Sequence, residues 1–220
     1  MYETPTATKN IIIINLIMFV ATLLNEQFMV ETFALFYPAS HLFKPWQLVT
    51  HMFMHAGFWH IFFNMYALFI FGSVLERTIG TKKFLIYYFV SGIGAMLLHT
   101  GVGFVESGHY LSAMAEGSSS AQLSYLRLLA TPTLGASGAI YGVLIGYAML
   151  YPESVLTLIF PPISFKARTF VLIFAGIELL TGIFATADGV AHFAHLGGML
   201  FGWLLMLYWR RSGRLWDNNY

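Results

Sequence analysis

The sequence predicts an all-α membrane protein in which six helices cross the bilayer and both chain ends lie on the cytoplasmic side. Of its 220 residues, 58% are hydrophobic and 10% are charged, whereas an ordinary soluble domain has about 25% charged residues. So few charged side chains cannot cover a water-facing surface, and apolar segments of about 20 residues suit membrane-crossing helices. The chain has no cysteine and a net charge of +1. Disulfides and a nucleic-acid interface are therefore not expected.

The predicted spans are apolar segments that helix-breaking residues separate. The first segment follows Lys9 and lacks a small-residue cleavage pattern, so we interpret it as a span and not as a signal peptide. Pro45, Pro152 and the pair Pro161-Pro162 mark later boundaries. We expect a single membrane-embedded domain over residues 1–220, with spans at residues 10–27, 53–75, 84–105, 133–151, 167–187 and 190–209.

A polar interruption at residues 106–131 separates the third span from the fourth. We expect its loosest part at residues 116–120, where glycine and serine cluster. Leucines near its end predict a short interfacial helix. These are Leu123, Leu126, Leu128 and Leu129.

Positively charged residues set the orientation, because cytoplasmic loops carry an excess of lysine and arginine. With both ends inside, only Lys44 and Arg127 of the 11 Lys and Arg residues lie outside. The others fall in cytoplasmic segments: Lys9, Arg77, Lys82, Lys83, Lys166, Arg168, Arg210, Arg211 and Arg214. Spans two, four and six are therefore expected to run from outside to inside.

Three polar residues fall at one depth in these inward-running spans. Ser137 and His195 each lie 14 residues before the cytoplasmic end of their span, and His60 lies 14 residues before Val74, next to the end of its span. At about 1.5 Å per residue, each is about 21 Å from the cytoplasmic face. In a hydrocarbon core about 30 Å thick, this depth is about 9 Å below the outer surface. If the helices meet, the serine and the histidine form a base-activated nucleophile.

Small residues give the fourth and sixth spans a means of close approach, because glycine stripes let helix backbones meet in lipid. The stripes consist of Gly138, Gly142 and Gly146 in span four and of Gly198 and Gly202 in span six. Facing stripes would bring the Ser137 hydroxyl toward the His195 imidazole, although such stripes also occur where helices merely pack. We expect alanine to be tolerated at Gly198 and larger side chains not to be.

His60 and Asn64 are spaced i, i+4 on span two, so they share one helix face. Both side chains can donate a hydrogen bond, and facing the serine they would stabilise the oxyanion of a tetrahedral intermediate. The alternative is that the pair only joins helices. Polar groups inside a membrane are costly, and three polar clusters that converge favour a functional site.

In order and spacing, these motifs resemble the rhomboid family of intramembrane serine proteases. The resemblance covers residues 45–205 and implies a six-helix rhomboid-like bundle. The matching pieces are His55 to His60 with Asn64, Gly72 to Gly80 with Glu76 and Arg77, Gly135 to Gly138 with Tyr141, and Ala194-His195 with Gly198 and Gly202.

The resemblance implies a Ser-His dyad, with Ser137 as nucleophile and His195 as general base and then acid. It implies that His60, Asn64 and the Ser137 amide stabilise the oxyanion, and that Tyr141 packs against the imidazole. The small residues Gly135, Gly138, Gly198 and Gly202 would support the site. Such an enzyme hydrolyses peptide bonds in or near transmembrane helices of other membrane proteins and needs no metal or cofactor. We expect it in the cell (inner) membrane, with the site open to the outer side.

Two residues do not fit the resemblance simply. Gln47 follows Trp46 where many relatives carry arginine, which puts the anchoring of that loop in question. Glu178 lies near the bilayer centre in span five, where an ionisable group is a functional hypothesis by default. The sequence identifies no partner for it, and either a structural hydrogen bond or a proton path is open.

Other polar residues have weaker functional interpretations. His51 and His55 are spaced i, i+4 but lack the carboxylate of an HExxH zinc motif. Asp188 precedes His192 and His195 at helical spacing, yet it lies beside a glycine at a span boundary, where water is expected. We therefore expect His192 to line a water-facing entrance and Asp188 to take no catalytic part.

Two alternative functions remain open. A small transporter could use Ser137, His195 and Glu178 as a substrate or proton path, but transporters usually show paired internal repeats, and none is evident. An inactive rhomboid relative could act as a binding protein for membrane helices. Such relatives usually lack the serine or the histidine, whereas this chain has both.

Overall fold

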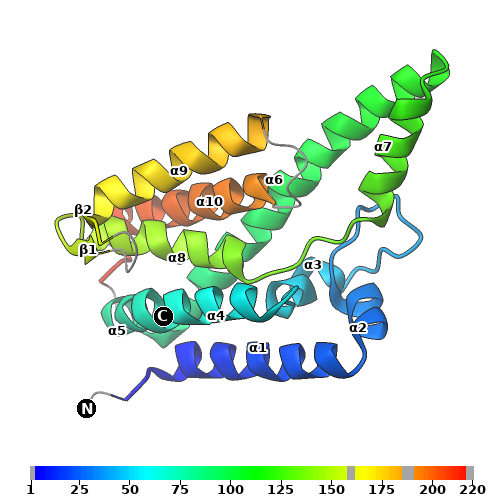
Figure 1. The fold of residues 1–220 in the computed structure, drawn as a ribbon. Helices are drawn as coiled ribbons and strands as arrows, with labels where there is room; N and C mark the ends of the chain where they lie inside the picture. The colour runs from blue at the N-terminus through cyan, green and yellow to red at the C-terminus, as the bar shows by residue number, and fades with distance from the viewer. Residues whose placement is uncertain (1–2, 158–161, 185–190, 217–220) are drawn as a thin grey trace.

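The computed structural model describes residues 3–157, 162–184 and 191–216, and these residues form a mainly helical bundle (Figure 1). α1, α4, α8, α10 and α9 lie side by side in that order, while α6 packs against α8 and α10. The helices are α1 (Thr6–Leu24), α2 (Glu26–Phe33), α3 (Gln47–Thr50), η1 (His51–Phe53), α4 (Phe58–Ala67), η2 (Leu68–Gly72), α5 (Ser73–Ile79), α6 (Thr81–Ala115), α7 (Ser119–Ala130), α8 (Ser137–Leu150), α9 (Ala167–Phe184) and α10 (His192–Arg211).

Each predicted span overlaps one of these helical stretches. Four stretches in the described residues are long and apolar enough to cross a membrane. They are Thr6–Leu24, Phe58–Ile79, Thr81–Ala115 and Ala167–Phe184. α8, with 14 residues, and α10 occupy the other two predicted segments. The count of six spans and the cytoplasmic position of both ends stay predictions.

Several predicted boundaries are wrong. α6 does not end near residue 105 but continues to Ala115, so the whole helix has 35 residues and is about 52 Å long at 1.5 Å per residue. The predicted polar loop at residues 106–131 is therefore largely helical, since α7 follows after a short turn and packs back against α6 (Figure 1). The predicted short helix near residue 123 is confirmed by α7.

The fourth span and the connection after it also differ from expectation. α8 begins at Ser137, not at residue 133, because the preceding residues run past α3 as an extended segment that pairs with Leu35 at Thr133. Between α8 and α9 the chain forms a small antiparallel hairpin of β1 (Val155–Thr157) and β2 (Ser164–Lys166). The prediction of a purely helical fold therefore omits one short hairpin.

Glu76 at the end of α5 fixes the start of α1. Its carboxylate accepts hydrogen bonds from the backbone amides of Ala7 and Thr8, at 2.9 and 2.7 Å, and from the hydroxyls of Thr8 and Thr81. The first amides of a helix have no intrahelical partners, and negative charge there is favourable. The buried carboxylate therefore ties the first two long helices together at the end of the bundle away from Ser137.

The predicted glycine stripes face each other, as expected. A Cβ atom placed on Gly198 would lie 1.8 Å from the carbonyl oxygen of Gly138. One placed on Gly202 would lie 3.1 Å from the Cα of Gly142. The Tyr87 hydroxyl of α6 also donates to the Gly142 carbonyl at 2.8 Å. The backbones of α8 and α10 are therefore in direct contact along this line, because neither helix has a side chain there.

Candidate active site

Ser137 is the first residue of α8, and a glycine shapes the chain just before it. Gly135 has a φ of 137°, a conformation that residues with a side chain rarely adopt. Its amide donates to the His51 carbonyl at 2.9 Å. A Cβ atom on Gly135 would also lie 2.9 Å from ring atoms of His60. Backbone conformation and limited space both require glycine where the chain turns into the helix.

The structure brings the predicted serine and histidine into contact. The Ser137 Oγ is 2.8 Å from the Nε2 of His195, and both residues are partly buried. Gly138 and Gly198, one and three residues further along their helices, approach each other closely beside this pair. The proximity inferred from depth and glycine stripes is confirmed. The chemical role of the pair remains to be tested.

Tyr141 lies one turn below Ser137 and covers one face of the imidazole. Its ring is stacked on that of His195, with centroids 4.3 Å apart and an angle of 13° between the planes. The phenol hydroxyl donates to the Oε1 of Glu178 on α9. Tyr141 thus holds the plane of the imidazole while its hydroxyl is held by another helix.

Glu178 has the partners that the sequence did not reveal. Its Oε2 is 2.6 Å from the Nδ1 of His192, and its Oε1 is 3.0 Å from the Nδ1 of His195. The carboxylate is buried, with 8% of the side chain exposed. It lies on the side of the imidazole opposite Ser137. α8, α9 and α10 therefore meet at one carboxylate.

Depth was the sequence signal that could have identified Glu178. It lies 11 residues from the end of α9 that is predicted to be cytoplasmic, about 17 Å along the helix. That depth is within about one helical turn of the depth expected for Ser137. The Nδ1 of His192 contacts Glu178 and, at 3.1 Å, the Thr181 hydroxyl, while the expected position of His192 at a water-facing entrance stays a prediction.

His60 and Asn64 lie on α4, and their side-chain hydrogen bonds are with α4 itself and with the residues just before it. The Asn64 amide donates to the His60 carbonyl at 2.9 Å, and the His60 Nδ1 accepts from the Ala56 amide at 3.3 Å. The other edge of the His60 ring lies against Gly135, two residues from Ser137. His60 therefore borders the serine, while the oxyanion role of both residues stays a prediction.

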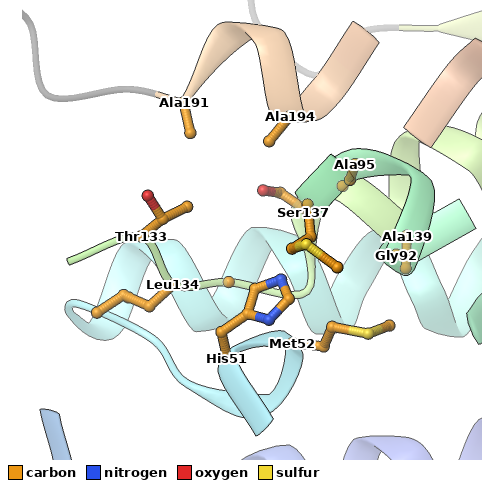
Figure 2. A pocket seen from close by; sticks show the side chains of 13 residues that line it. His51, Met52, Gly92, Ala95, Thr133, Leu134, Ser137, Ala139, Ala191 and Ala194 are labelled. Atoms are coloured by element: carbon orange, nitrogen blue, oxygen red, sulfur yellow. The ribbon is translucent and has the colours of Figure 1, made fainter. Parts of the chain in front are cut away.

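A small pocket opens beside the serine hydroxyl (Figure 2). Figure 2 shows Ala191 and Ala194 on one side of the Ser137 hydroxyl and Thr133 and Leu134 on the other. His51 closes the pocket from the side of η1. Small and apolar residues thus surround the hydroxyl and leave room for a narrow group.

Gln47 anchors the loop whose attachment the sequence left in question. Its side chain is fully buried, and its Oε1 accepts from the amide of Lys44 at 3.0 Å. Its amide nitrogen donates to the carbonyls of Glu31 and Leu42, at 3.1 and 3.0 Å. A neutral amide therefore joins α2, the following loop and α3, and arginine is not needed for this connection.

His51, which precedes α4, is neutral and has a structural contact. Burial lowers the pKa of His51 to about 4. Its Nδ1 donates to the Gln47 carbonyl at 2.8 Å, while His55 packs edge-on against the ring of His60. The two histidines therefore have different surroundings, one a backbone carbonyl and the other a second imidazole ring.

Glu178, His192 and His195 are the described group whose spacing comes nearest to a metal site, with candidate ligand atoms within 4.8 Å of one another. Tetrahedral zinc with bonds of about 2.0–2.1 Å separates its ligand atoms by about 3.3 Å. The 2.6 Å contact between His192 and Glu178 is too short for an ion that binds both. The group fits direct hydrogen bonding better. Asp188 lies outside the described residues.

Comparison with known proteins decides the family. The profile of the rhomboid domain matches residues 42–212, which is most of the chain. The chain belongs to the rhomboid family. It is 32% identical over 162 residues to RHOMBOID-like protein 6, mitochondrial, of Arabidopsis thaliana, covering 74% of this chain. It is 30% identical over 184 residues to the human presenilin-associated rhomboid-like protein, mitochondrial, covering 83% of this chain.

A shorter match links this rhomboid to a bacterial relative. It is 46% identical over 48 residues to the putative rhomboid protease YdcA of Bacillus subtilis, which is 22% of this chain and 24% of that protein. The plant and human alignments span 43% and 42% of the lengths of those relatives. This rhomboid is an integral membrane protein, and its relatives support a protease.

Proposed function

We propose that this rhomboid is an intramembrane serine endopeptidase in which Ser137 and His195 form the catalytic dyad. The 2.8 Å contact between Ser137 Oγ and His195 Nε2 carries the proposal, because a serine becomes a useful nucleophile when a base lies within hydrogen-bond reach. The stacked Tyr141 supports it further, since the imidazole must keep its plane while protons move.

The geometry supports a two-step acyl transfer. The Ser137 Oγ attacks the carbonyl carbon of the scissile bond as its proton passes to the His195 Nε2. The C–N bond then breaks and the imidazolium gives that proton to the departing amine, which leaves an acyl ester on Ser137. Water, activated by the same imidazole, hydrolyses the ester and restores the serine.

The developing oxyanion would lie at the N-terminus of α8. The first amides of a helix, including that of Ser137, have no intrahelical partners and carry partial positive charge. His60 borders the same point, and Asn64 lies one turn further along α4. We assign the three groups to oxyanion stabilisation, which requires donors about 2.7–3.1 Å from the oxyanion.

The substrates would be transmembrane helices of other membrane proteins that reach the site from the bilayer. A peptide bond within a helix is shielded, so substrates should carry helix-weakening glycine or proline near the cut. The positive-inside pattern favours a site near the outer face of a cell (inner) membrane. The small pocket beside Ser137 would admit a narrow side chain next to the scissile bond.

Active-site labelling tests the proposal directly. Detergent-purified protein is treated with a fluorophosphonate and, separately, with a single-span reporter substrate. Wild type should label and cleave, whereas Ser137→Ala should do neither and keep its melting temperature, since one hydroxyl is lost and no volume is added. Ser112→Ala removes an exposed helical hydroxyl and is the matched control. Cleavage by purified Ser137→Ala, with contaminating proteases inhibited, would refute Ser137 as nucleophile.

A further inference from the structure

We infer that Glu178 is a positioning residue for the proposed dyad: its carboxylate fixes the tautomer of His195 and stabilises the imidazolium that forms during catalysis. The inference rests on the proposed function and adds a third member, from α9, to the serine and the histidine. The resemblance to the family implied only two.

The tautomer follows from the two nitrogens of His195. Nε2 is 2.8 Å from the Ser137 hydroxyl and must accept its proton, so the neutral ring carries its hydrogen on Nδ1. That nitrogen is buried, and the Glu178 Oε1 lies 3.0 Å from it. The two groups are close but do not form a hydrogen bond in the resting structure. Catalytic hydrogen bonds are often poorly aligned before substrate binds.

Charge gives the carboxylate a second effect. When Ser137 attacks, the imidazole gains a proton, and a negative group 3.0 Å from Nδ1 stabilises that cation. Coulomb attraction depends little on the angle of the N–H bond and is stronger in a buried site than in water. The attraction appears only when the imidazolium forms, so it lowers the barrier more than it strengthens substrate binding.

The other contacts of Glu178 hold the carboxylate in place. Tyr141 and His192 donate to different oxygens, so neither oxygen can turn away from the imidazole without losing a partner. These donors also make the burial of a carboxylate tolerable, since a buried charge without partners is very costly. The same contacts would equally suit a residue that merely clamps three helices, so an experiment must separate the two roles.

Two substitutions at Glu178 separate charge from shape. Glu178→Gln keeps the shape and can still accept from Tyr141 and His195, but it has no charge. Glu178→Asp keeps the charge and shortens the side chain. A positioning carboxylate predicts that Gln lowers kcat by roughly 10²-fold or more with little change in KM, since loss of the equivalent acid in a serine protease triad costs about 10⁴-fold. Asp should retain at least about ten times the kcat of Gln. If Glu178 only held the helices together, Glu178→Gln, which keeps the shape, would have a higher kcat than Glu178→Asp.

The assay uses the full-length protein in detergent, with the reporter cleavage rate, the fluorophosphonate labelling rate and the melting temperature measured together. Thr181→Val on the same helix removes a hydroxyl that contacts His192 and not His195, and is the matched control. It should keep kcat within a few-fold of wild type. Wild-type kcat in Glu178→Gln, or a kcat in Glu178→Asp no higher than in Glu178→Gln, would overturn the inference.

The two proposals fail differently. If wild type neither cleaves nor labels, the proposed function falls and the inference with it. If wild type does both and Ser137→Ala does neither, the dyad stands, and the Glu178 variants alone decide whether the carboxylate assists it.

Discussion

Alanine at Gly198 tests whether contact between the two helix backbones sets the distance of the dyad. The new Cβ atom would lie 1.8 Å from the oxygen and 2.7 Å from the carbon of the Gly138 carbonyl, while real Cβ atoms essentially never come within 3.0 Å of another atom. The clash is with backbone, which no rotamer change can relieve. α10 must therefore move by about 1 Å from α8, and a shift of that size can lower the rate by about 10²-fold.

The distance between Gly198 and the Gly138 carbonyl corrects the expectation from the sequence that alanine is tolerated at Gly198. The glycine stripe predicts close approach but not its size, and the contact is too short for even one methyl group. The position of Gly198 therefore has room for glycine but not for alanine.

The assay compares kcat for reporter cleavage and the melting temperature of Gly198→Ala with those of Gly176→Ala. A Cβ atom on Gly176 of α9 meets nothing within 4 Å, so this substitution is a matched control. We expect Gly198→Ala to lose activity and stability and Gly176→Ala to lose neither. Equal kcat and melting temperature in the two variants would refute the idea that this contact brings Ser137 to His195.

Two further predictions concern α4 and the loop before it. His60→Ala and Asn64→Ala should each lower kcat for reporter cleavage by roughly 10²–10³-fold, the usual effect of losing one oxyanion donor, and the double variant should lose much less than the product. Wild-type rates in both single variants would leave α4 as scaffold alone. Gln47→Ala should lower the free energy of unfolding by about 1–3 kcal/mol, because it leaves buried carbonyls and amides without partners. An unchanged melting temperature would contradict it.

The sequence predicts the contact between Ser137 and His195 because the depth of a residue in a helix and the face on which two helices meet both follow regular rules. Depth follows from the rise of a helix, and the facing of two helices follows from where glycine removes the side chains. Both quantities can be counted along the chain. The same arithmetic would have put Glu178 near this depth.

The partners of Glu178 could not be predicted because the rotation of α9 about its axis is not fixed by its composition. Only Ala167, Val171 and Glu178 of this helix are buried, and apolar residues cover every face. The end of α6 was missed for another reason. Hydropathy falls where a helix leaves the membrane, but the helix itself has no need to end there, and α6 continues to Ala115.

Few side chains of α9 are buried in the bundle, and one of them is Glu178. The packing of α9 against the bundle and the chemistry at His195 therefore depend on each other. Beyond Val171, the buried side chain of the helix is the Glu178 carboxylate, and lipid offers no hydrophobic force that would return a displaced helix to the bundle. A substrate helix that enters by displacing α9 would take the carboxylate away from His195. Under our inference, the order of events is then fixed: the substrate enters, α9 returns, and only then is the peptide bond cut. A membrane helix that passes by without allowing α9 to return would meet an enzyme whose base lacks its counter-charge, and would be cut far more slowly.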